Sequence, residues 1–156
     1  MTTQSALIMA VGRSDRMRSG GCTTHKALRS VCGSTLIEHN LRMLSWHGFT
    51  DVSVAVNSSE SELQSWLATT GLCLAGQCGF ELHVLIEEQP LGTIDSARSF
   101  ASSREHLLVV NVDNLTDLSL QDFYDFHIGR ARRSPWPLAR SHFASLLASS
   151  IPLTLA

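Results

Sequence analysis

Three residues near the start of the chain, Gly12, Arg16 and Lys26, are of the types that bind phosphate groups. An apolar run precedes them and ends in a turn that contains Gly12, Ser14 and Asp15. Glycine permits a close backbone approach, and free N–H groups in such a turn can hold phosphate oxygens. Arg16 and Lys26 would add positive charge to the same place. The pattern predicts a polyphosphate site, and the alternative is an ordinary loop with solvated cations.

Asp113 is a second candidate for chemistry, because it directly follows the apolar run at residues 107–112. A carboxylate at the carboxyl end of a strand is well placed to hold Mg²⁺, which prefers oxygen ligands and substrate phosphates. The alternative is a loop carboxylate that caps the next turn together with Asn114 and Asp117. Asp117 itself is more typical of the start of a helix.

The elements that must position these residues alternate along the chain. Strands are predicted at residues 6–10, 51–56, 80–86 and 107–112, and helices at 35–47, 58–67, 92–102 and 118–128. This alternation predicts a Rossmann-like α/β sandwich of three layers, with a mostly parallel sheet between helices. Ligands bind such sheets beyond the carboxyl ends of the strands. Gly12 and Asp113 are both expected at that edge.

The same segments resemble the sugar-1-phosphate nucleotidyltransferases. When Gly12 is set on the first glycine of the family's N-terminal signature, Arg16 and Lys26 match its arginine and lysine without a gap. The resemblance covers about residues 5 to 130 in the family's order, and it continues through residues 33–39, 88–93 and 109–117. It is closest to the uridylyl- and guanylyltransferases that act on hexose, heptose or muramic acid 1-phosphates.

The resemblance implies transfer of a nucleoside monophosphate from an NTP to a sugar 1-phosphate, with release of pyrophosphate, in nucleotide-sugar biosynthesis. It implies catalytic roles for Arg16, Lys26 and Asp113, with Asp113 as the ligand of Mg²⁺. Arg16 would hold the β- and γ-phosphates, and Lys26 the α-phosphate and the sugar phosphate. The nucleotide and substrate contacts that it implies are Ala10, Gly12, Ser14, Asp15, Arg16, Lys26, Gly92, Thr93 and Asn111.

Two of these contacts lie in the segment Pro90-Leu91-Gly92-Thr93. In the resembling family this loop contacts the base and the ribose. The alternative from the residues themselves is a turn in which Thr93 caps the following helix.

Six positions depart from the family pattern, and the mildest change is Ser14 in place of a glycine. Val11 and Val112 replace small residues and are expected to add bulk where the family keeps its backbone exposed to ligand. Asp15 brings negative charge near the expected polyphosphate. His25 and Ala27 stand where the family has prolines that stiffen the lysine loop. We expect these changes to affect turnover more than fold.

The end of the chain departs more strongly. After a nucleotide-binding domain at residues 1–130, we expect an atypical tail at 131–156, in which aspartate and glutamate are absent. We interpret it as the end of a truncated or frame-shifted nucleotidyltransferase fold, and the alternative is a closing amphipathic helix at 138–147. The alternative functions are a nucleotide-binding remnant with weak or no catalysis, and a molybdopterin-type nucleotidyltransferase.

Composition excludes other classes. A net charge of −2 without a basic run argues against a nucleic-acid partner. The N-terminal apolar run is too short for a signal peptide or a membrane span. The four cysteines have no zinc-ligand spacing and are typical of reduced thiols. We therefore expect a cytoplasmic protein whose partners are an NTP and a sugar 1-phosphate, and the sequence leaves a homo-oligomer open.

Overall fold

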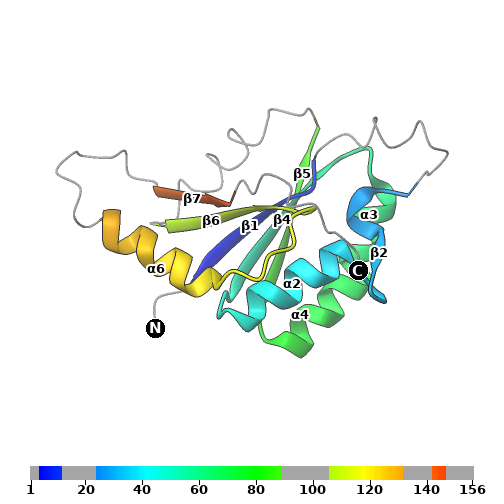
Figure 1. The fold of residues 1–156 in the computed structure, drawn as a ribbon. Coiled ribbons are helices and arrows are strands. Elements are labelled where there is room, and N and C mark those ends of the chain that lie inside the picture. Colours follow the sequence, from blue (N-terminus) through cyan, green and yellow to red (C-terminus); the bar gives the residue numbers. More distant parts are fainter. Residues whose placement is uncertain (1–3, 12–23, 89–105, 132–141, 147–156) are drawn as a thin grey trace.

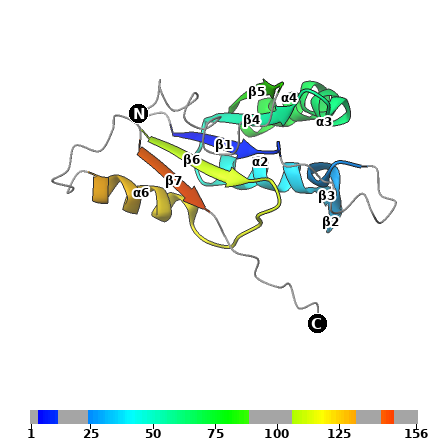
Figure 2. The same cartoon turned by 90° about the horizontal axis from the view of Figure 1, so that it is seen from above.

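A sheet of five parallel strands forms the centre of the molecule (Figures 1 and 2). The computed structural model describes residues 4–11, 24–88, 106–131 and 142–146. The strand order is β5-β4-β1-β6-β7. The strands are β1 (Ser5–Met9), β4 (Asp51–Asn57), β5 (Glu81–Glu87), β6 (His106–Asn111) and β7 (His142–Leu146). The predicted α/β fold with a parallel sheet is confirmed.

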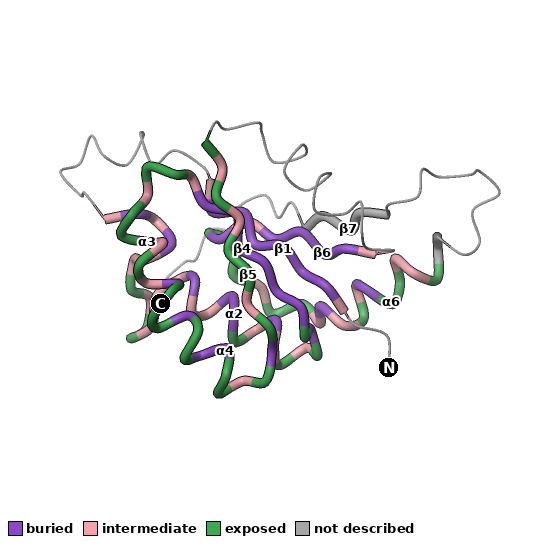
Figure 3. Tube along the Cα trace, turned by 180° about the vertical axis from the view of Figure 1, so that it is seen from behind, coloured by how far each residue is buried: buried purple, intermediate pink, exposed green. Residues whose placement is uncertain are grey.

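The three central strands are buried on both faces (Figure 3), as their nearly continuous apolar sequences require. The described helices pack against one of these faces (Figure 1). They are α2 (Leu36–Trp46), α3 (Ser61–Trp66), α4 (Leu72–Cys78) and α6 (Leu120–Ala131). Thr35 caps α2 by accepting a hydrogen bond from the N–H of Glu38.

The opposite face carries a second buried cluster, formed by Leu7, Met9, Ala55, Leu107 and Val109. Within the described ranges no helix contributes to this cluster. The helix predicted at 92–102 lies outside the described residues, so the third layer stays a prediction.

A small hairpin joins the segment around Lys26 to α2. The short helix η1 (Lys26–Leu28) is followed by β2 (Ser30–Val31) and β3 (Ser34–Thr35), which pair in antiparallel fashion. The two residues between them, Cys32 and Gly33, both have positive φ, at 49° and 89°. This is the backbone of a tight two-residue hairpin turn, in which glycine fits the second position without strain.

Two expectations about secondary structure were wrong. The helix predicted to end near Leu67 continues to Cys78, through a π-helical turn, η2 (Leu67–Gly71). It continues because the next turns are also buried, and Gly71 allows close approach to β5: a Cβ there would lie 3.2 Å from Leu82 Cδ2.

The second error concerns the end of the chain. Residues 142–146, within the helix offered as an alternative at 138–147, form β7, which pairs with β6. These residues form a strand because they hydrogen-bond to the edge of β6. The periodicity of the tail sequence gives no information about whether such an edge is available.

Candidate active site

The candidate site lies at the carboxyl edge of the sheet, where β1 and β6 are neighbours. Along the chain, β4 and β5 are added on one side of β1, and β6 and β7 are then added on its other side. The strand order therefore reverses between β1 and β6. Ligands of open α/β sheets bind in the crevice outside such a point. Met9 pairs with Asn111 at the ends of the two strands, so the residues that follow each strand leave the sheet side by side.

Asp113 stands on a tight turn directly after β6. The N–H of Val112 donates to the carbonyl oxygen of Met9 at 3.1 Å, and the N–H of Asn114 donates to that of Asn111 at 3.0 Å. These two bonds fix the backbone on both sides of Asp113. Its side chain is 51% exposed, so the carboxylate is open to ligands.

Val112 does not add bulk on the ligand side, contrary to the expectation from sequence. Its side chain is fully buried in the main core cluster, which lies on the face covered by α2. Because successive side chains of an extended chain point to opposite sides, the residue before Asp113 points inward. An apolar residue therefore fits this position, and the turn remains open beside Asp113.

Lys26 is held by its two neighbours. His25 is buried and caps η1, because its Nδ1 accepts a hydrogen bond from the N–H of Ala27 at 3.1 Å. Ala27 is fully buried in the core. The side chain of Lys26, with 19% exposure, therefore projects from an anchored segment. His25 and Ala27, which replace prolines of the resembling pattern, provide this anchoring by capping and by burial.

The structure brings Lys26 and Asp113 together. The Nζ of Lys26 donates to Oδ2 of Asp113 at 3.0 Å, across 87 positions of sequence. An ammonium group and an exposed carboxylate at this edge are complementary to the two parts of a metal–polyphosphate complex. The arrangement can hold anionic phosphate with one group and its cation with the other.

The remaining predicted residues divide into two sets. Ala10 and Asn111 lie at the ends of β1 and β6. Ala10 is fully buried, and its N–H donates to the carbonyl oxygen of Ala55 at 2.9 Å. Asn111 is partly exposed and closes the Asp113 turn through its carbonyl oxygen. The others, Gly12, Ser14, Asp15, Arg16, Gly92 and Thr93, lie outside the described residues.

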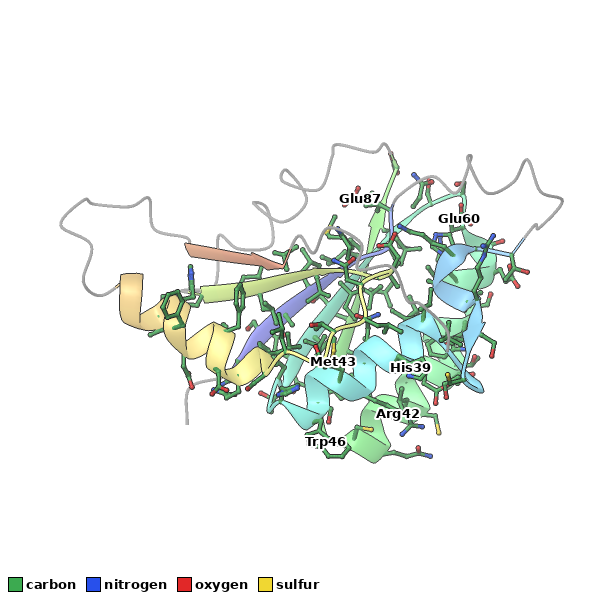
Figure 4. The ribbon with its side chains drawn as sticks, viewed as in Figure 1. His39, Arg42, Met43, Trp46, Glu60 and Glu87 are labelled. Atoms are coloured by element: carbon green, nitrogen blue, oxygen red, sulfur yellow. The ribbon has the colours of Figure 1, made fainter. Side chains whose placement is uncertain are left out.

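Two polar residues of this region, Asn40 and Glu87, were not predicted from the sequence. Asn40 on α2 is fully buried and bonded to the Asp113 turn. Glu87 ends β5 at the same edge (Figure 4), and its carboxylate oxygens are buried with no hydrogen-bond partner among the described residues. For Asn40 there was a signal, since it interrupts an apolar stripe at helical spacing. For Glu87 there was none, because its burial depends on tertiary structure.

The described residues contain no group of three or more histidine, cysteine, aspartate or glutamate side chains that could hold a metal ion. Mg²⁺ is usually held by one or two carboxylates together with substrate phosphates and water, and Asp113 could supply one such carboxylate. In the same part of the chain, no helix has the length and hydropathy needed to span a membrane.

Residues 6–119 match the family model described as the MobA-like NTP transferase domain. The N-acetylmuramate alpha-1-phosphate uridylyltransferase of Neisseria meningitidis is 31% identical over 119 residues, which cover 72% of this chain and 48% of the relative. The mannose-1-phosphate guanyltransferase of Debaryomyces hansenii is 27% identical over 125 residues, covering 78% of this chain and 33% of the relative. The chain thus spans about half or less of the length of these curated relatives.

The fold is also similar to solved structures. A putative glucose-1-phosphate thymidylyltransferase from Bacillus anthracis aligns with a TM-score of 0.67 at 16% identity, over 81% of this chain and 51% of that one. HddC from Yersinia pseudotuberculosis aligns with a TM-score of 0.65 at 17% identity, over 81% of this chain and 55% of that one. At these identities the likeness shows a shared fold.

Proposed function

The chain belongs to the MobA-like NTP transferase domain family, and on this premise we propose that it is a cytoplasmic sugar-1-phosphate nucleotidyltransferase. In the proposed reaction, a phosphate oxygen of the sugar 1-phosphate attacks the α-phosphorus of an NTP. A new P–O bond forms, the bond between the α-phosphorus and the bridging oxygen breaks, and pyrophosphate leaves with the electron pair. The names of the two curated relatives, each of which refers to a sugar 1-phosphate, support this assignment.

The ion pair between Lys26 and Asp113 carries the proposal. These two residues lie 87 positions apart, and the fold joins them at the point where the strand order reverses. Phosphoryl-type transfer needs little covalent chemistry from the protein, since positioning and charge neutralisation supply most of the effect. An anchored cation and an exposed carboxylate at this place are suited to that task.

Lys26 would leave Asp113 when substrate binds and would contact the α-phosphate and the incoming sugar phosphate. Arg16 would hold the β- and γ-phosphates, and the turn with Gly12, Ser14 and Asp15 would surround them. These roles follow from the match to the family pattern.

The donor set at Asp113 fits Mg²⁺. An exposed carboxylate offers hard oxygen donors of the kind that Mg²⁺ prefers, and in the ligand-free protein one of them is paired with the ammonium of Lys26 at 3.0 Å. When bound, Mg²⁺ would neutralise charge that develops on the phosphates. Asp113 would hold it, and Asn111 would contact the substrate beside it.

The loop with Gly92 and Thr93 would contact the base and ribose, next to the buried end of β1 at Ala10. Glycine there would permit close approach of the backbone to the nucleoside. This role, too, follows from the family pattern.

A second candidate is a protein that binds nucleotide with weak or no turnover. The observation that favours it is coverage, because the chain spans 48% of the uridylyltransferase and 33% of the guanyltransferase. Both candidates predict nucleotide binding, and they differ in pyrophosphate release.

A screen of pyrophosphate release separates the two. Each of the four NTPs is combined with a panel of sugar 1-phosphates in the presence of Mg²⁺, and the chain with Asp113→Asn serves as control. Release that depends on one sugar 1-phosphate and is lost with Asp113→Asn supports the transferase. Nucleotide binding without release supports the second candidate, and absence of binding for all four NTPs contradicts both.

A further inference from the structure

Asn40 is a polar residue at a core position of α2. The positions of this helix that face the sheet are Ile37, Asn40, Leu41 and Leu44, and each is fully buried. Asparagine lowers helix propensity in a helix interior, and a buried amide must replace the hydrogen bonds that it made with water. A leucine would pack there without either disadvantage. The asparagine therefore calls for an explanation other than packing.

Its side-chain amide provides one. The Nδ2 of Asn40 donates to the carbonyl oxygen of Leu36 in its own helix and to that of Val112, both at 2.9 Å. Val112 immediately precedes Asp113. Since the peptide group is planar, a bond to the carbonyl of Val112 also fixes the orientation of the N–H of Asp113 and the position of its Cα.

The turn of Asp113 is thus tied to two elements of the fold. The N–H of Val112 bonds to β1 through Met9, and its carbonyl bonds to α2 through Asn40. The turn is also closed on itself between Asn111 and Asn114. With the backbone held on both sides, the direction in which the carboxylate projects is set by the fold.

We propose that Asn40 is a positioning residue, which holds the Val112–Asp113 peptide so that the carboxylate faces Lys26 and the metal–nucleotide complex. The identity of the ligand, a metal–nucleotide complex, rests on the proposed function. The effect of Asn40 on the turn is independent of that function. Residues that orient a metal ligand typically change metal affinity 10- to 100-fold when they are replaced.

The variant that tests this is Asn40→Leu, which keeps a side chain branched at Cγ and removes the donor. Two quantities are measured: the dissociation constant of each Mn²⁺–NTP complex, and the hydrogen exchange of the Asn114 amide, whose bond to Asn111 closes the turn. We expect the dissociation constant to rise about 10- to 100-fold. We also expect the Asn114 amide to exchange roughly 10 times faster, because one of the bonds that order the turn is lost.

Asn40→Gln, which keeps an amide donor, is expected to restore both quantities at least in part. The matched control is Ser45→Ala, which removes another bond from α2 to a distant backbone carbonyl, that of Cys78 at 3.0 Å. It is expected to change neither quantity. If Asn40→Leu does not fold, Asn40→Ala gives the same comparison, since alanine also lacks the donor and favours the helix.

Unchanged Asn114 exchange in a folded Asn40→Leu chain would overturn the inference, and so would an unchanged dissociation constant. If the unmodified chain binds no Mn²⁺–NTP complex, the proposed function fails. The exchange of Asn114 then decides the positioning of the turn independently.

Discussion

Replacing Lys26 by methionine tests whether this residue serves the ligand or the fold. The change removes the charge, keeps most of the side-chain length, and breaks the 3.0 Å pair with Asp113. The carboxylate of Asp113 is 51% exposed, so water screens the pair in the ligand-free protein. Screened pairs of this kind contribute about 0.2–1 kcal/mol, and the free energy of unfolding should fall by no more than this.

Nucleotide binding should respond more strongly to the same change. A charge-assisted hydrogen bond from an ammonium to a phosphate contributes roughly 1.5–3 kcal/mol. Its loss corresponds to a dissociation constant that is about 10 to 150 times higher. The two magnitudes are different enough to distinguish a ligand-binding lysine from one that only stabilises the fold.

The assay is calorimetric titration with NTP and Mg²⁺, together with chemical denaturation of the same samples. Arg42→Ala is the matched control, because Arg42 is the cation of another exposed pair, 2.9 Å from Glu38, on the side of α2 that faces away from the sheet (Figure 4). A dissociation constant within twofold of the unmodified chain, combined with a larger loss of stability than the control shows, would refute the reasoning.

Three further changes have defined expectations. Asp113→Asn should abolish the Mg²⁺ dependence of nucleotide binding while Asp117→Asn preserves it, as measured by titration with and without Mg²⁺; the reverse pattern would move the metal ligand to Asp117. Cys32→Asn should raise the free energy of unfolding by about 0.5–1 kcal/mol, because φ at this position is 49° and asparagine tolerates that region better; denaturation in reducing buffer checks this, and a decrease contradicts it. Ser53→Ala should leave stability unchanged or raise it by up to about 1 kcal/mol, since the hydroxyl is fully buried with no hydrogen-bond partner among the described residues; a clear loss of stability would show that the hydroxyl is satisfied.

The sequence was sufficient to predict the central strands and the helix that follows the hairpin. The apolar runs of β1, β4 and β6 are local patterns, and so is the spacing of Ile37, Leu41 and Leu44 on α2. The alternation of these elements also predicted a parallel sheet. Strand and helix periodicity are properties of consecutive residues, which is why they can be recognised without knowledge of the fold.

Tertiary contacts decided what the local patterns could not. The continuation of the helix past Leu67 depends on burial against β5, and residues 142–146 form a strand because the edge of β6 is there to pair with them. In both cases the partner is another secondary-structure element, whose position is set by the fold. Local periodicity therefore ended the helix too early, and it did not reveal the strand at residues 142–146, where a helix had been the alternative.

The candidate site shows the same division. Residue types and spacing singled out Lys26 and Asp113 separately, and the resemblance placed them in one pattern. Their 3.0 Å contact exists because β6 pairs directly with β1 while β4 and β5 lie on the other side. The role inferred for Asn40 likewise depends on a bond across 72 positions. The sequence thus determined which groups could do chemistry, and strand order, which is set by contacts between distant segments, decided which of them meet.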